Sequence, residues 1–169
     1  DMAARLQAPL TVRFACLAND LGKGTTAAEV LPRHIGHEER SAELLKDVAE
    51  RLRVPVDCRE TADVVAREHG HIHRSGDLSA AALVRLLERC DAIRKPERFA
   101  DILLACECDA RGRLGFEESA YPQRQRLAAV LAAVQSVVTR DIAAQAAAKG
   151  LAGPQVGALI HQARVEAVA

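Results

Sequence analysis

The stretch Val12-Arg-Phe-Ala-Cys-Leu-Ala-Asn-Asp-Leu-Gly-Lys-Gly24 combines a helical pattern with a polar turn. Apolar side chains recur around it at spacings of three and four residues: Leu10, Phe14, Leu17 and Leu21. This spacing predicts one face of a helix, which Gly22 can end. Asn19 and Asp20 then fall in the last turn. A carboxylate there opposes the helix dipole, so Asp20 is expected to have a cation partner.

Further helices are expected along the chain, and no segment has a convincing strand pattern. We expect them at 41–52, at about 57–69, after an N-cap at Ser79, from Pro96 toward Asp109, from Pro122, between Thr139 and Gly150, and from Pro154. Loops are expected at 24–36 and 70–77. Aromatic residues make up 2% of the chain, so Ala, Leu and Val carry its apolar content. The pattern predicts an all-α fold of about eight helices.

The composition excludes several classes of protein. Lys and Arg number 23, as do Asp and Glu, so no net positive field attracts nucleic acid. The five cysteines form no CxxC pair, which argues against a disulfide framework and a structural zinc site and favours the cytoplasm. No apolar run approaches the roughly 18 residues that span a bilayer, so no membrane is expected.

Histidines and acids gather in one part of the chain. Five of the six histidines lie between His34 and His73, and Asp20 and Asp109 occupy helix ends that could face the same crevice. In an extended turn, the alternating histidines His69, His71 and His73 would point the same way. Imidazole and carboxylate together suit a divalent metal that activates water. The alternative is a solvated histidine-rich loop. His161, isolated in the last helix, is expected to be an ordinary surface or packing residue.

The phrase Asn19-Asp-Leu-Gly-Lys23 resembles the segment that names the HD superfamily of metal-dependent phosphohydrolases, in which a helix ends in His-Asp followed by Leu-Gly-Lys. Later phrases resemble landmarks of the bacterial multifunctional CCA proteins, in the same order and at compatible spacing. They are Leu31-Pro-Arg-His-Ile-Gly-His37, Arg51-Leu-Arg-Val-Pro55, Cys90-Asp-Ala-Ile-Arg-Lys-Pro-Glu-Arg98, Asp109-Ala-Arg-Gly-Arg-Leu-Gly-Phe116 and the tail from Lys149 to Gly157.

The resemblance implies an HD-domain helical bundle over residues 1–138, with a small helical appendage at 139–169. It also implies that the chain is a fragment, truncated at its N-terminus and lacking the nucleotidyltransferase head and the magnesium that serves it. Proteins of this family rebuild the CCA end of tRNA, so tRNA is the expected partner through the parent protein, and a homodimer is possible. Their HD region adds phosphatase, 2'-nucleotidase and 2',3'-cyclic phosphodiesterase activities, so a phosphomonoester or cyclic phosphodiester is the expected substrate.

The resemblance also assigns residues. The metal, expected to be nickel, manganese or cobalt, falls to Asp20, His37, His69, His73 and Asp109. Catalytic roles fall to Asp20, Lys23 and His34. Phosphate or RNA contacts fall to Arg111, Arg113, Arg94, Lys95 and Arg98. It remains open which of His69, His71 and His73 is a ligand, since His71 has no clear counterpart. Asp91, at another helix end, is the rival of Asp109.

The chain departs from the family pattern in two ways. Asn19 replaces the histidine of the His-Asp dipeptide, and a neutral amide oxygen binds a transition metal less well than imidazole nitrogen does. An earlier family histidine would lie upstream of residue 1. One alternative is therefore a catalytically silent HD scaffold that braces the parent enzyme and supports tRNA. A more generic alternative is an unrelated helical interaction module.

Overall fold

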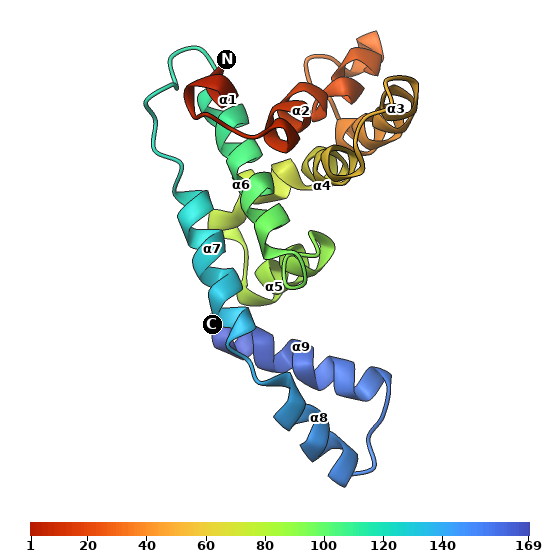
Figure 1. Cartoon of the computed structure of the whole chain (residues 1–169), viewed down its shortest axis with the longest axis vertical. Helices are drawn as coiled ribbons and strands as arrows, with labels where there is room; N and C mark the ends of the chain where they lie inside the picture. Colours follow the sequence, from red (N-terminus) through yellow and green to blue (C-terminus); the bar gives the residue numbers. More distant parts are fainter.

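Nine α-helices and three short 3-10 helices make up the chain, and the computed structural model describes all of it, residues 1–169, without a strand (Figure 1). The α-helices are α1 (Met2–Arg5), α2 (Leu10–Ala18), α3 (His37–Arg51), α4 (Val56–His73), α5 (Ala80–Arg89), α6 (Pro96–Arg111), α7 (Pro122–Gln135), α8 (Thr139–Ala148) and α9 (Pro154–Val168). The 3-10 helices are η1 (Leu21–Thr25), η2 (Ala28–Val30) and η3 (Ser75–Asp77). The all-α prediction is confirmed.

The predicted helix starts follow local chemistry. The Ser79 hydroxyl accepts a hydrogen bond from the backbone N–H of Ala82 and caps α5. Pro96, Pro122 and Pro154 each occupy the first turn of a helix, where the missing N–H of proline costs nothing.

Helices α2, α4 and α6 pack against one another at the centre of the molecule, and Figure 1 shows α6 running through its middle. The face of α2 that enters this core carries the small side chains Val12, Ala15 and Ala18, which are almost completely buried. Of the expected apolar face, Phe14 and Leu21 pack against this core, whereas Leu10 and Leu17 are 66% and 76% exposed, so the expected face is only partly the packed one. Small side chains occupy the buried face because they let the backbones of neighbouring helices approach closely.

Helix α4 is longer than expected. It runs through Gly70 to His73 without a turn, so the segment from Gly70 onward does not form the extended loop anticipated from its composition. A helical period places residues four apart on one face and turns the residue between them away. His69 and His73 therefore share a face. His71 lies outside that face and contacts Glu68 at 3.2 Å.

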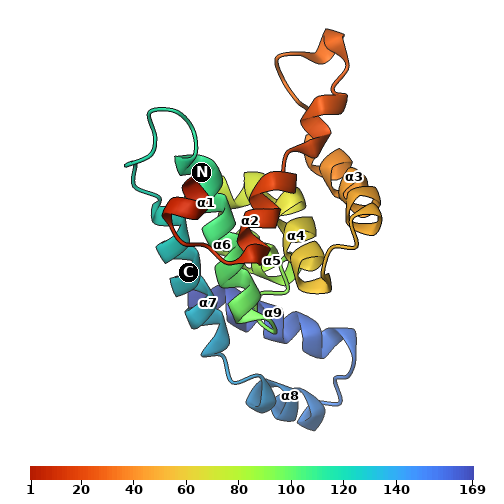
Figure 2. The ribbon, with the colours of Figure 1, turned by 45° about the horizontal axis from the view of Figure 1, so that its top comes forward.

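The predicted loop at 24–36 contains the end of η1 and the whole of η2, and it projects from the body of the molecule (orange in Figure 2). At the opposite end, α8 and α9 form a helical tail (blue in Figures 1 and 2), and α9 packs on α5 and α7. A domain boundary at residue 138 stays a prediction. No single helix is both long and apolar enough to cross a bilayer; only the pair α7 and α8 reaches that length and composition, with a 40° bend between them.

Candidate metal centre

Three side chains from different elements converge on one point. Asp20 follows α2, His37 begins α3 and His69 lies in the last part of α4. Their ligand atoms all lie within 4.8 Å of one another. The Asp20 Oδ1 atom is 3.3 Å from His37 Nε2 and 3.7 Å from His69 Nε2, and the two Nε2 atoms are 3.4 Å apart. Two atoms that bind one ion at about 2.1 Å lie about 3.0–3.5 Å apart, so the spacing suits a metal.

Backbone carbonyls orient both imidazole rings. His37 Nδ1 lies 2.8 Å from the carbonyl oxygen of His34. His69 Nδ1 lies 2.9 Å from the carbonyl of Val65 and 3.1 Å from that of Ala66, within its own helix. A carbonyl only accepts, so each Nδ1 must carry the proton that it donates. In the neutral rings, the lone pairs on both Nε2 atoms then point into the space that they share with Asp20.

Asp20 brings a third acceptor into this space. Its Oδ1 atom is buried without a hydrogen-bond partner, while its Oδ2 atom accepts a 2.6 Å hydrogen bond from Lys23 Nζ. Three acceptors facing one another without a donor are unfavourable in a partly buried site. A bound cation would satisfy all three, and two imidazole nitrogens with one carboxylate oxygen suit a divalent transition metal. The donor set therefore fits the ion that the family resemblance implies.

Gly22 allows the segment that carries Asp20 to pack closely against the helix that carries His37. Gly22 lies in η1, directly against the start of α3, and its backbone N–H donates to the Ser41 hydroxyl at 2.9 Å. A Cβ atom at Gly22 would lie 2.3 Å from the carbonyl oxygen of His37 and 2.6 Å from the Ser41 nitrogen. Only glycine leaves room for this contact, which holds Asp20 and His37 on adjoining elements.

Two more of the expected ligands bind each other beside the triad. His73 Nε2 is 2.9 Å from Asp109 Oδ2, and His73 Nδ1 is 2.9 Å from the hydroxyl of Tyr121. The His69 and His73 ring centroids are 5.9 Å apart. A metal role for His73 and Asp109 stays a prediction, and it requires their mutual hydrogen bond to open.

The charges around Asp109 and Tyr121 fix their protonation. Burial raises the pKa of Asp109, but the hydrogen bond from His73, with the charges of His73, Arg113 and His69, lowers that pKa below its ordinary value overall. Burial also raises the pKa of Tyr121, helped by the nearby acidic groups. Asp109 is thus held ionised and Tyr121 protonated, which leaves His73 hydrogen-bonded at both ring nitrogens.

Asn19 stands where the family resemblance places a histidine. It is 3% exposed, and its side-chain Nδ2 atom has no hydrogen-bond partner. Leaving a buried amide donor unpaired costs free energy. Nothing at this position replaces the imidazole of the family pattern, so the triad lacks one of the family's nitrogen ligands.

Two members of the triad, His37 and His69, lie in the wall of a cavity of about 490 Å³. Its lining includes His37, His69 and His73 with the cations Lys23, Arg74 and Arg113. Arg74 was not singled out in the sequence. Its guanidinium makes no ion pair and lies over Gly70, where an added Cβ would come within 3.5 Å of it. Its place directly after the helical histidines is the signal that could have found it.

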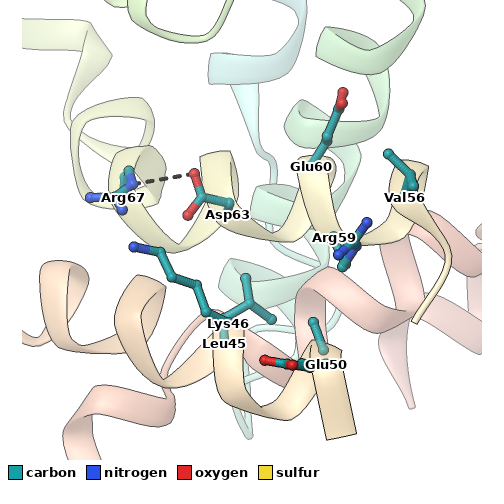
Figure 3. Close-up of a pocket in the computed structure, with 9 residues that line it drawn as sticks. Leu45, Lys46, Glu50, Val56, Arg59, Glu60, Asp63 and Arg67 are labelled. Carbon is teal, nitrogen blue, oxygen red and sulfur yellow. Dashed lines mark hydrogen bonds and ion pairs between the residues drawn. The ribbon is translucent and has the colours of Figure 1, made fainter. Parts of the chain in front are cut away.

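A larger cavity, of about 740 Å³, lies between α3 and α4 (Figure 3). It contains no histidine, and three of its charged side chains, Glu60, Asp63 and Arg67, already form ion pairs. Arg67 pairs with Asp63 at 3.2 Å and with Glu39. Figure 3 shows Glu60 pointing away from α3, and its carboxylate binds Lys95 and Arg98. The histidine cavity is therefore the candidate site.

Other residues singled out in the sequence lie away from the triad. His34 contributes its carbonyl, while its ring pairs with the Thr26 hydroxyl at 2.8 Å. Arg113 lines the cavity 3.9 Å from Asp109, whereas Arg111 binds Glu107 and the carbonyl of Glu117. The remaining ones form ion pairs elsewhere: Arg94 and Arg98 with Asp91, Lys95 and Arg98 with Glu60, and His161 with Glu88.

Comparison with known proteins places these observations in a family. Residues 1–103 match the family described as HD domain. The whole chain is 82% identical to the multifunctional CCA protein of Verminephrobacter eiseniae (strain EF01-2) and covers 41% of it. It is 77% identical to the multifunctional CCA protein of Acidovorax sp. (strain JS42) and 59% identical to that of Leptothrix cholodnii, covering 40% of each. The chain thus spans about two fifths of the length of these curated relatives. No solved structure matches it.

Proposed function

Because the chain belongs to the HD-domain family, we propose that it is the metal-dependent phosphohydrolase region of a longer CCA-adding protein. Its substrates are phosphomonoesters and 2',3'-cyclic phosphodiesters. The observation that carries this proposal is the convergence of Asp20 Oδ1, His37 Nε2 and His69 Nε2, which all lie within 4.8 Å of one another. Hydrolysis of a phosphoester needs a centre that attracts an anion and activates water, and such a donor set can hold the required ion.

Asp20, His37 and His69 would hold nickel, manganese or cobalt. Bound there, such an ion would supply Lewis-acid polarisation of a phosphoryl oxygen and easier ionisation of water. The chain itself supplies the charge that draws the substrate in. Arg74 and Arg113 present planar guanidinium groups in the cavity, a geometry that matches phosphate oxygens. Lys23 adds a third cation while it holds the Asp20 carboxylate in place.

Asn19 favours a second candidate function. If the missing imidazole lowers metal affinity below useful levels, the same fold serves as a silent scaffold that braces the parent protein and supports tRNA. Asn19 supports this alternative, because it directly precedes Asp20 in the chain and its buried, unpaired amide supplies no imidazole nitrogen.

An assay with matched variants separates the two functions. The purified chain is incubated with adenosine 2',3'-cyclic monophosphate and with nickel, manganese or cobalt in turn. The hydrolase proposal expects turnover by the unmodified chain and a loss of at least about a hundredfold in Asp20→Asn, because a neutral amide holds a cation poorly. His71→Ala is the control, since this half-exposed histidine faces away from the triad.

The variant Asn19→His tests the alternative, in which the fold is a silent scaffold. Turnover by this variant alone supports the scaffold function and assigns the silence to Asn19. Failure of both the unmodified chain and Asn19→His contradicts the hydrolase proposal. Equal turnover by the two shows that Asn19 does not weaken the site.

The parent protein's partners follow from the same proposal. The relatives are named as multifunctional CCA proteins, so we propose tRNA as the parent's substrate, a magnesium-dependent head outside this chain and a cytoplasmic setting. Each cation of the basic cluster Arg94, Lys95 and Arg98 is already paired with Asp91 or Glu60, which leaves one net positive charge on the cluster. It therefore contributes little to tRNA binding, and the cavity cations are the better candidates for phosphate contacts.

A further inference from the structure

One aromatic side chain stands at the cavity without a structural role. The chain has only three Phe and one Tyr. Phe99 is 1% exposed and Phe14 packs against the core. Tyr121 lines the cavity and pairs with His73. Phe116 also lines the cavity, yet it is 55% exposed. Two of the four Phe and Tyr side chains, Phe116 and Tyr121, therefore line this one cavity.

The loop between α6 and α7 holds Phe116 in place. The Phe116 N–H donates to the carbonyl of Arg113 at 2.9 Å, and its own carbonyl accepts from the N–H of Ser119 at 3.0 Å. Arg111 donates twice to the carbonyl of the next residue, Glu117, at 2.9 and 3.1 Å. The ring is therefore exposed on an anchored backbone, and little conformational entropy is lost when a ligand contacts it.

Exposure alone does not make Phe116 a binding residue. Leu114, two residues earlier in the same loop, is 95% exposed and does not line the cavity. What distinguishes Phe116 is its place in one cavity with His37, His69, Arg74 and Arg113. A ligand that satisfies this lining has an anionic end for the cations and a flat apolar end for the ring. A nucleotide has both, and about 490 Å³ is within the size range of small-molecule sites.

We infer that Phe116 is the surface on which the nucleobase of a nucleotide substrate stacks while its phosphate lies at the triad. The inference rests on the proposed function for the position of the phosphate. Every base presents a π face, so such a platform selects nucleotides over base-free phosphoesters without selecting one base by hydrogen bonds. Phe116 thus determines the class of substrate, and it takes no part in the bond-breaking step.

The test compares two substrates that share a five-membered cyclic phosphodiester. Adenosine 2',3'-cyclic monophosphate carries a base and glycerol 1,2-cyclic phosphate does not. We expect Phe116→Ala to lower the ratio of their kcat/KM values by about tenfold, because stacking one base on an aromatic ring changes affinity by about fivefold to a hundredfold. The change should appear mainly in KM for the nucleotide. Phe116→Tyr should keep the ratio, and Leu114→Ala, the matched control, should keep it as well.

A binding measurement separates this inference from the hydrolase proposal. Calorimetry with adenosine 2'-monophosphate in the absence of added metal ion involves no turnover, and Phe116→Ala should raise its Kd by about tenfold. If the unmodified chain hydrolyses neither cyclic phosphate, the hydrolase proposal fails and the calorimetric result alone decides the inference. Equal Kd values for Phe116→Ala and the unmodified chain overturn the inference. Failure of the unmodified chain to bind the nucleotide, or an equal loss in Leu114→Ala, overturns it too.

Discussion

At the scale of single residues, the candidate site depends on which ring nitrogen of each histidine is left free. His69 donates from Nδ1 to carbonyls within its own helix, and His37 donates to the carbonyl of His34. Both arrangements are local in the chain, and both leave Nε2 as the ligand atom. The family resemblance could name these histidines, but only the coordinates show that their free nitrogens face each other and Asp20.

Gly22 offers a sharp test of this geometry. We expect Gly22→Ala to destabilise the chain by about 1–3 kcal/mol or more, because its Cβ would lie 2.3 Å from a backbone oxygen of α3 and force η1 away. Divalent-metal affinity should fall in the same variant, since Asp20 moves with η1. Urea denaturation and metal titration measure the two effects.

Gly24 in the same 3-10 helix provides the control, because a Cβ there meets nothing within 4 Å. Gly24→Ala should change stability by no more than about 0.5 kcal/mol. Equal stability of the two variants would show that the contact between Gly22 and α3 does not position the site.

At the scale of elements, the sequence predicted the helix starts best, because they depend on chemistry within one turn of the chain. Ser79, Pro96 and Pro122 marked helix starts correctly, because capping and the missing proline N–H act within one turn. The end of α4 was missed. Gly70 and the polar residues after it suggested a turn, yet contacts of α4 with α2 and α6 extend the helix to His73. The packed face of α2 was only partly predicted for a similar reason, since only tertiary packing favours Ala15 and Ala18 over Leu10 and Leu17.

An ion-pair bridge between α6 and α7 makes the packing of these elements dependent on pH. Glu107 accepts hydrogen bonds from Arg111 of α6 and Arg124 of α7, both at 2.8 Å. Burial raises the pKa of Glu107, but the hydrogen bonds and charges of the two arginines lower that pKa overall. A carboxyl whose pKa is lower in the folded state stabilises the fold above its ordinary pKa. That stabilisation is lost as the pH falls through the lowered value.

Glu107→Gln should therefore lose about 1 kcal/mol of unfolding free energy at pH 7. Between about pH 5 and pH 3 its stability should fall less steeply than that of the unmodified chain. Thermal unfolding followed by circular dichroism at a series of pH values measures both effects. Glu117→Gln is the control, because its carboxylate makes no ion pair. An identical pH dependence for Glu107→Gln and the unmodified chain would exclude the bridge as a source of stability.

At the scale of the whole molecule, the site exists because distant segments meet. Asp20, His37 and His69 lie on segments that the packing of α2 and α3 against α4 brings together. Composition and spacing predicted an all-α chain and a concentration of histidines and acids. They could not show that Asp109 would bind His73 rather than join Asp20, or that Arg74 would face the cavity. Such outcomes depend on the relative rotation of packed helices, which the helical period of one segment does not determine.

Anomalous X-ray diffraction from crystals of the chain grown with nickel or manganese tests the central claim most directly, because it locates the ion itself. The account predicts one strong anomalous peak, about 2.0–2.3 Å from each of Asp20 Oδ1, His37 Nε2 and His69 Nε2. A map without a peak at these atoms at saturating metal, or with its strongest peak at another group of side chains, would contradict it.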